Sequence, residues 1–399
     1  MLPSLTRRSA LLGLTASFSL GGTSLALASA ATDRRLVVVI LRGALDGLAA
    51  VTPYGDRDLA SWRADIVLPQ PGSANGLLDL GGFYGLHPAL AGLHGLYKAN
   101  ELLPVHAVAG PYRSRSHFEA QDNLEFGTPD HTNGPRMTSG WLNRAASGLA
   151  PQSNAELAFA VGSVVPLLLR GPAPIGTWLP ATATHPGTDL YARIAAMHRG
   201  DAITGRAVRD GLRDRGFSDA VLAGAEAPRN TANSFPALAE AAGRLLADPK
   251  GPRIAALELG GWDTHAGQAP RLAGVLGQLD RGLIGLKTGL GSAWAQTVVL
   301  VMTEFGRTVH VNGTNGTDHG TAGVAFALGG AVAGGKVRAT WPGLATPKLV
   351  EARDLAPTAD LRALAKGMLS GHLGLGAMQL ATIFPASGEA APMTGLLRS

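Results

Sequence analysis

The chain has 399 residues, of which 46% are hydrophobic and 16% are charged, a composition that suits a globular protein with a substantial core. Its formal net charge is +5 without any block of like charge, which argues against a nucleic-acid partner. Cysteine is absent, so the fold must be held together by its core or by bound metal, because no disulfide can form.

The first 30 residues have the features of an export signal. Paired Arg7 and Arg8 precede a mildly apolar segment, and Ala28-Ser29-Ala30 supplies an A-x-A cleavage pattern. The twin arginines predict a Tat signal peptide over residues 1–30, with the Tat translocon as partner during export. An ordinary Sec signal or a lipid-free anchor is the alternative. We expect a periplasmic or extracellular protein without a permanent membrane span, since no later stretch reaches the roughly 20 apolar residues that a span needs.

Continuous apolar runs alternate with helical patterns along the rest of the chain. Runs of this kind are typical of strands buried on both faces of a parallel sheet, and they occupy residues 36–41, 101–110, 154–162, 252–261 and 295–306. Apolar residues at three-to-four spacing predict helices over residues 87–100, 235–248, 268–290 and 357–374. The alternation predicts one α/β domain over residues 31–399, a three-layer sandwich around a mostly parallel central sheet. Residues 323–330 and 336–341 are expected to form a later antiparallel pair.

Polar residues follow several of these apolar runs. In an open α/β sheet, ligands bind beyond the carboxyl ends of the strands, so these residues should share one rim. Carboxylates and imidazoles gathered in this way can hold one divalent ion of Zn, Mn, Mg or Ca. The alternative is that they pair with nearby arginines and serve only the structure. The candidate metal ligands are Asp46, Asp263, His265, Glu304, Asp318 and His319.

The segment "SRSHFEAQD" allows two interpretations. Ser116 and Glu119 match a capping box, in which each side chain bonds the backbone of the other residue. A helix N-terminus also receives anions well, because its unpaired N–H groups and its dipole point at them. Ser116, or Ser114 in its place, is therefore the candidate nucleophile for a phosphate or sulfate ester, with Arg115 to steady the anion.

An ordered set of segments suggests a relationship to a known family. The segments are "LVVVILRGALDGL", "FYGLHPALAGLHGLY", "VHAVAGPYRSRSHFEAQD", "LGGWDTHAGQ", "MTEFGRTVHVNGTNGTDHG" and "GGAVAGGKVRATWPGL". In this order they resemble a bacterial exported family, domain of unknown function 1501, over essentially the whole mature chain. That family is placed near the alkaline phosphatase and sulfatase superfamily. The resemblance therefore implies an alkaline-phosphatase-like α/β sandwich, and it implies a fold more than an activity.

The superfamily pattern also implies roles for residues near the start of the rim. Asp46 resembles the acidic ligand that follows the first strand, and Ser116 stands where a nucleophile begins a helix. Asp263 and His265 resemble an Asp-plus-His pair, although only one residue separates them here.

The later part of the pattern departs from the superfamily. Glu304 resembles the acid of an Asp-His dipeptide at the end of a central strand, but Phe305 follows it and cannot bind a metal. His319 resembles the last histidine ligand, with Asp318 beside it to compensate. These departures favour one metal ion or none over a two-metal site.

Two functions from different classes follow. The leading hypothesis is a metal-dependent hydrolase of phosphate or sulfate esters, in which Ser116 attacks and Arg115 or Arg307 steadies the anion. The alternative is a catalytically inactive envelope protein that uses the same polar rim for binding or structure. Either function predicts an anionic small molecule or a glycan as ligand.

Overall fold

A computed structural model describes residues 32–128, 137–149, 157–162, 164–178, 221–222 and 234–398. The predicted signal peptide over residues 1–30 lies outside the described residues. Within these ranges, every helix is too short or too polar to cross a membrane.

Eight strands of the described residues form the central sheet. Their order across the sheet is β11 (Ala359–Asp360), β5 (Leu102–Ala109), β10 (Gly323–Leu328), β9 (Thr297–Thr303), β1 (Arg35–Leu41), β8 (Ile254–Leu259), β6 (Ala158–Val161) and β7 (Ile175–Trp178). Neighbouring strands pair in parallel, except that β10 runs antiparallel to both β5 and β9. The prediction of a mostly parallel sheet is confirmed, and each of the five apolar runs contains a strand.

Strand β1 shows why the apolar runs are continuous. All seven of its residues are buried, and its side chains alternate between two separate cores. Val37 and Val39 pack into the core on one face, while Val38 and Ile40 pack into the core on the other. A strand covered on both faces needs no polar positions, so it reads as an unbroken apolar stretch.

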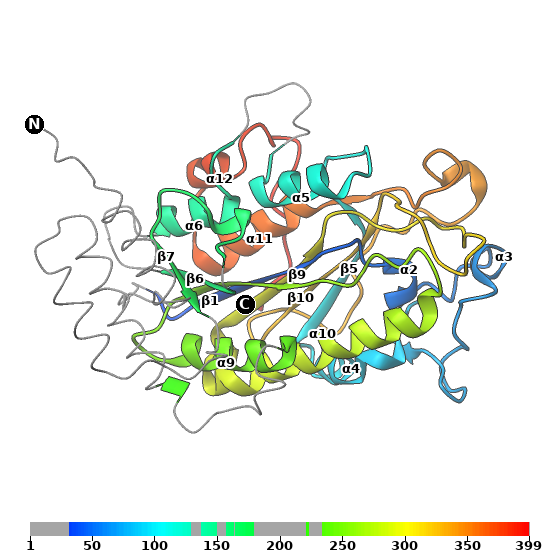
Figure 1. Ribbon diagram of the computed structural model, residues 1–399, viewed down its shortest axis with the longest axis horizontal. Helices are drawn as coiled ribbons and strands as arrows, with labels where there is room; N and C mark the ends of the chain where they lie inside the picture. The colour runs from blue at the N-terminus through cyan, green and yellow to red at the C-terminus, as the bar shows by residue number, and fades with distance from the viewer. Residues whose placement is uncertain are drawn as a thin grey trace, which may run out of the picture.

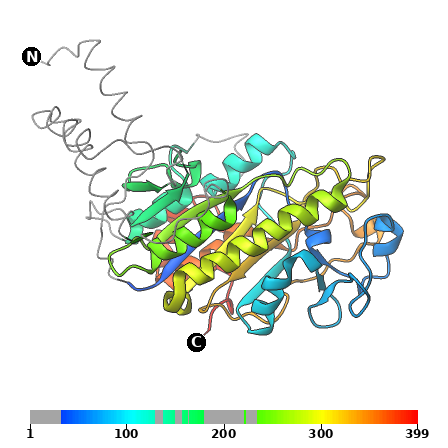
Figure 2. The ribbon, with the colours of Figure 1, turned by 60° about the horizontal axis from the view of Figure 1, so that its bottom comes forward.

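Helices cover the two faces of the sheet and complete three layers (Figure 1). One face carries α4 (Ala91–Lys98), α9 (Phe235–Ala247) and α10 (Gln268–Leu290), and Figure 2 shows α9 and α10 side by side on it. The other face carries α5 (His117–Phe126), α6 (Trp141–Leu149), α11 (Leu361–Leu373) and α12 (Ala377–Ile383). The predicted three-layer α/β sandwich is therefore confirmed. Smaller elements lie beside it: α2 (Gly47–Ala50), α3 (Leu59–Arg63), and a small sheet of β2 (Val51–Thr52), β4 (Gly85–Leu86) and β3 (Leu78–Asp79).

The expected antiparallel pair of residues 323–330 and 336–341 is wrong. Strand β10 lies between β5 and β9, so both of its edges are already hydrogen-bonded. From the second segment, Arg338 forms an isolated bridge to Val105 of β5 instead. The pattern of apolar residues in a sequence does not show which strands of a sheet still have an unpaired edge.

The loops that follow β1, β8 and β9, and the one that leads from β5 into α5, leave the same edge of the sheet. The parallel register brings the ends of three of these strands together, with Leu41 opposite both Leu259 and Thr303. Gly43 allows a close approach of two of these loops, because a Cβ on it would lie 2.7 Å from the backbone nitrogen of Asp263. This edge carries the polar residues that the sequence singled out.

Candidate metal centre

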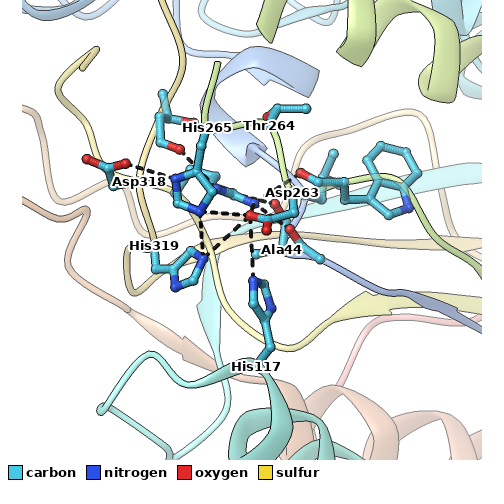
Figure 3. A network of polar contacts seen from close by, with 12 residues as sticks. Ala44, His117, Asp263, Thr264, His265, Asp318 and His319 are labelled. Atoms are coloured by element: carbon cyan, nitrogen blue, oxygen red, sulfur yellow. Dashed lines mark hydrogen bonds and ion pairs between the residues drawn. The ribbon is translucent and has the colours of Figure 1, made fainter. Parts of the chain in front are cut away.

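Three histidines converge on one carboxylate at this edge. The Nε2 atoms of His265, His319 and His117 lie 2.9, 3.4 and 3.6 Å from Oδ1 of Asp263 (Figure 3). Asp263 and His265 come from the loop after β8, and His319 from the loop after β9. His117 is the first residue of α5. Segments remote in sequence thus bring their side chains to a common point, as the sequence predicts for Asp263, His265 and His319.

Each imidazole is oriented by an acceptor behind it. The Nδ1 atom of His117 lies 2.8 Å from Glu304 Oε1, that of His265 lies 2.9 Å from Asp318 Oδ1, and that of His319 lies 3.0 Å from the carbonyl oxygen of Arg115. An ionised carboxylate or a carbonyl can only accept, so each Nδ1 must carry the hydrogen. When such a ring is neutral, its Nε2 atom therefore presents a lone pair to the cluster.

Lone pairs placed in this way can be shared by one cation. His265 Nε2 and His319 Nε2 are 2.9 Å apart, and His117 Nε2 is buried without a hydrogen-bond partner among the described residues. His117, Asp263 and His319 each offer one ligand atom, and these atoms lie within 4.8 Å of one another. Imidazole nitrogens held by outer carboxylates and carbonyls, together with one carboxylate oxygen, are the usual donors to Zn²⁺. The residues present therefore fit a divalent metal ion.

Arg307 binds the carboxylate of Asp263 from the buried side of the site. Its side chain is fully buried, and Nη2 lies 2.5 Å from Asp263 Oδ1. Partial burial raises the pKa of Asp263, but the hydrogen bond and charge of Arg307 outweigh it, so the pKa of this carboxyl is lowered. Arg307 also donates to the carbonyls of Ala44 and Thr317, and so ties the loops after β1 and β9 together.

The pKa values of two of the histidines move in opposite directions. The hydrogen bond that His117 donates to Glu304 raises the pKa of His117, and the charges of Glu304 and Asp263 add to this rise, while burial opposes it. Burial lowers the pKa of His319, and the nearby His117 lowers it further. His319 is therefore the poorer place for a proton, and it offers a lone pair at neutral pH.

Glu304 and Asp318 lie behind the histidines. Besides His117, Glu304 Oε1 accepts from Gly43 N and Gln121 Nε2, at 2.8 and 3.1 Å. Asp318 Oδ1 accepts from Asn312 Nδ2 at 3.0 Å as well as from His265. The structure thus brings both residues to the site, but as partners of imidazoles.

Asp46 is not brought into the cluster. It is 1% exposed and caps the N-terminus of α2, accepting from Ala49 N. Its Oδ2 accepts from Arg63 Nη1 at 2.8 Å and from Gln268 Nε2 at 2.6 Å. A buried carboxylate with these donors has its charge balanced without a metal ion.

Ser116 precedes α5, but the predicted capping box is wrong. Its side chain makes no capping hydrogen bond within the described part of the chain, and Glu119 instead accepts from the Tyr112 hydroxyl. Ser116 stands between Arg115, whose carbonyl holds His319, and His117. The guanidinium of Arg115 bonds Glu351 and Asp354, at 2.7 and 2.9 Å.

His117 is the residue that sequence reasoning missed. One sequence feature could have identified it as a site residue. His117 is the first helical residue after the predicted strand over residues 101–110, close to the carboxyl end of that strand. Phe305 packs against it with ring centroids 4.9 Å apart. Phe305 also lies 5.1 Å from the ring of His319. The phenyl ring thus contacts two of the converging imidazoles.

Solved structures with a similar chain path share little sequence with this protein. The crystal structure of Ps i-CgsB in complex with k-i-k-neocarrahexaose is 10% identical over 90% of this chain and 77% of that one, with a TM-score of 0.43. The C-terminal periplasmic domain of EcEptC from Escherichia coli, a complex with Zn, is 11% identical over 77% and 76%, with a TM-score of 0.33. The lipoteichoic acid synthase LtaP from Listeria monocytogenes is 10% identical over 83% and 73%, with a TM-score of 0.34.

The sequence comparisons identify the family. No curated protein matches the chain. The model of one family matches residues 94–383, a range that includes the segments carrying His117, Asp263, His265, Glu304 and His319. The family resemblance predicted from the order of the motifs is confirmed. The chain belongs to the family described as "Protein of unknown function (DUF1501)".

Proposed function

We propose that this protein is a metal-dependent hydrolase of phosphate or sulfate esters, with one divalent ion held by His117, Asp263, His265 and His319. The convergence of three Nε2 atoms on Asp263 Oδ1, with each Nδ1 engaged elsewhere, carries the proposal. A proton could relieve one lone-pair contact, but a metal ion accepts all of the donors at once.

The donor set favours a transition metal. Imidazole nitrogen suits Zn²⁺, whereas Ca²⁺, Mg²⁺ and Mn²⁺ favour oxygen ligands. Of the four ions that the sequence leaves open, we therefore propose Zn²⁺. When bound, such an ion supplies Lewis-acid chemistry that polarises an ester oxygen.

The site is open on the side that a substrate would approach. The side chains of Asp263 and His265 are 48% and 42% exposed, whereas those of Glu304 and Arg307 beneath them are fully buried. Helix α5 begins at His117 in the cluster, and the N–H groups and dipole of a helix N-terminus favour an anionic ester. We propose that Ser116, which is free of any capping bond in the described residues, is the nucleophile.

The arginines have different roles in this proposal. Arg307 orients Asp263, because its guanidinium is buried and donates to this carboxylate and to backbone carbonyls. Arg115 positions His319 through its own carbonyl oxygen. An anion at the rim would therefore be stabilised mainly by the cation and by the N-terminus of α5.

We also propose that the protein is exported through its N-terminal 30 residues and works in the periplasm or outside the cell. Replacing Arg7 and Arg8 with lysine should retain the protein in the cytoplasm if the route is Tat, as cell fractionation would show. Unchanged export would favour the Sec alternative.

Turnover tests the function. The purified protein is assayed with an aryl phosphate and an aryl sulfate, before and after chelation and after addition of Zn²⁺ or Mn²⁺. The proposal expects turnover that chelation removes, that metal restores, and that Asp263→Ala abolishes. The control is His94→Ala, which alters a histidine bonded to the Asp79 carbonyl in the small sheet. Metal-binding but inert protein would support the alternative of a binding protein that does not catalyse.

A further inference from the structure

Four donors hold the side chain of Glu304 behind the cluster. Its carboxylate is fully buried, directly after β9. Oε1 receives the N–H groups of Gly43 and His117 at 2.8 Å and of Gln121 at 3.1 Å. Oε2 lies 2.9 Å from Thr303 Oγ1. Such a carboxylate has little freedom to move toward a metal ion, and its first oxygen is already filled by donors.

From this geometry we infer that Glu304 is a positioning residue: it fixes His117 with its hydrogen on Nδ1 and its lone pair on Nε2, and its charge strengthens His117 as a metal ligand. The inference rests on the proposed metal centre. Carboxylates behind ligating imidazoles orient the ring and make the ligand nitrogen more electron-donating. Metal affinity should then depend on a residue that does not touch the metal.

The contribution of Glu304 can be compared with those of the other acceptors, because the groups that accept from the three histidines differ in charge and in burial. Glu304 is a fully buried carboxylate, whereas Asp318 is a carboxylate that is 50% exposed. His319 has a neutral backbone carbonyl as its acceptor. Charge acts more strongly where water is excluded, so Glu304 should contribute more to its histidine than Asp318 does.

Glu304→Gln removes the charge and preserves the hydrogen bonds. The amide oxygen can take the place of Oε1 and keep its three donors. The amide nitrogen then faces Thr303 Oγ1 and can donate to it, because the hydroxyl hydrogen of Thr303 has a second acceptor, Leu41 O, at 2.9 Å. The second hydrogen of the amide nitrogen has no acceptor among these groups, which should cost about 1–3 kcal/mol and leave the variant folded. Asp318→Asn is the matched control, since it makes the same chemical change at the exposed acceptor.

The test measures Zn²⁺ affinity by competition with a chromophoric chelator for the wild type and both variants. We expect Glu304→Gln to weaken binding by about 10- to 100-fold, the range typical of outer partners, and Asp318→Asn to weaken it less. Equal affinities for Glu304→Gln and the wild type would overturn the inference. So would a larger loss for Asp318→Asn.

A second readout reports on the ring itself. In the metal-free wild type, ¹⁵N NMR well above the ordinary imidazole pKa should show His117 with a hydrogen on Nδ1 and none on Nε2. The reverse tautomer would overturn the inference. If the wild type binds no metal, the proposed function fails, and this tautomer still decides the role of Glu304 separately.

Discussion

The Nε2 atoms of His265 and His319 lie 2.9 Å apart, although each ring has already given its Nδ1 hydrogen to another acceptor. Two neutral imidazoles would therefore face each other with lone pairs. Protonation of His319 is disfavoured, because burial lowers its pKa. A shared metal ion would remove the conflict, and it would also provide a partner for the buried Nε2 of His117.

Removal of one ligand should abolish tight metal binding without unfolding the protein. His319→Ala takes away one of the converging donors, so Zn²⁺ affinity should fall by more than the about 10- to 100-fold expected for an outer partner. The free energy of unfolding of the metal-free protein should fall by about 1–2 kcal/mol, because the Arg115 carbonyl loses its donor while the side chain is only partly buried. Titration calorimetry and urea denaturation measure the two quantities. Unchanged affinity in His319→Ala, with His94→Ala as control, would exclude His319 as a ligand.

Metal affinity should fall as the pH is lowered. Glu304 raises the pKa of His117, so a proton competes with the metal for Nε2 at a higher pH than for an ordinary histidine. Below this raised pKa, affinity should drop about 10-fold per pH unit for each proton displaced. The free energy of unfolding of the metal-free protein should instead rise as the pH is lowered. Protonated His117 contributes stability, and this stability is lost as the pH rises through its folded-state pKa. Zn²⁺ titrations between about pH 8 and pH 6 check the first effect; a flat profile would contradict it.

Buried histidines elsewhere should make the fold sensitive to acid. Burial lowers the pKa values of His87, His106 and His372 to about 4, from 6.5 in an unfolded chain. Because the folded-state pKa is depressed, their contribution to stability is complete above about pH 6.5 and is lost as the pH falls toward 4. Lowering the pH from 7 to 5 should therefore reduce the free energy of unfolding by about 2 kcal/mol for each of these histidines.

His106 gives the sharpest version of this test. Its Nδ1 accepts from Ala107 N, and its Nε2 donates to Val51 O at 2.9 Å, so the neutral ring is fully satisfied. Urea denaturation at the two pH values should show a smaller loss of stability in His106→Gln than in the wild type. An equal loss in both proteins would place the acid sensitivity elsewhere.

Arg307 should be important for stability as well as for the site. Its fully buried guanidinium donates to Ala44 O, Thr317 O and Asp263 Oδ1. Arg307→Ala leaves the two carbonyls unpaired and takes a positive charge away from Asp263, so it should lower the free energy of unfolding by about 3–5 kcal/mol. Arg307→Lys should also be destabilising, because an ammonium group cannot reproduce the planar set of donors. Arg57→Ala, at a side chain that is 92% exposed, is the control and should change stability by less than about 1 kcal/mol.

The sequence predicted the sheet well, because the fold leaves a simple signal there. Strand β1 is buried on both faces and therefore reads as a continuous apolar run. The carboxyl ends of β1, β8 and β9 meet at one edge, and this rule alone located Asp263, His265 and His319 near one another.

The orientation of the side chains at this edge was beyond sequence reasoning. Glu304, which lies 187 positions away in sequence, orients His117 toward the cluster, and no local sequence pattern predicts this pairing. Asp46 looks like a ligand in sequence, but it faces Arg63, whose fully buried side chain could not be foreseen from the chain alone. Partners remote in sequence decide whether a carboxylate at a strand end contacts a metal ion, an imidazole or an arginine.

The most direct test of the metal centre is X-ray absorption spectroscopy of the Zn²⁺-loaded protein. The account predicts one Zn²⁺ per chain with three imidazole nitrogens and one carboxylate oxygen at about 2.0–2.2 Å. His117→Ala should remove one of these nitrogens from the shell, whereas His94→Ala should leave the shell unchanged. A shell made of oxygen atoms, or a protein that takes up no metal at all, would contradict the account.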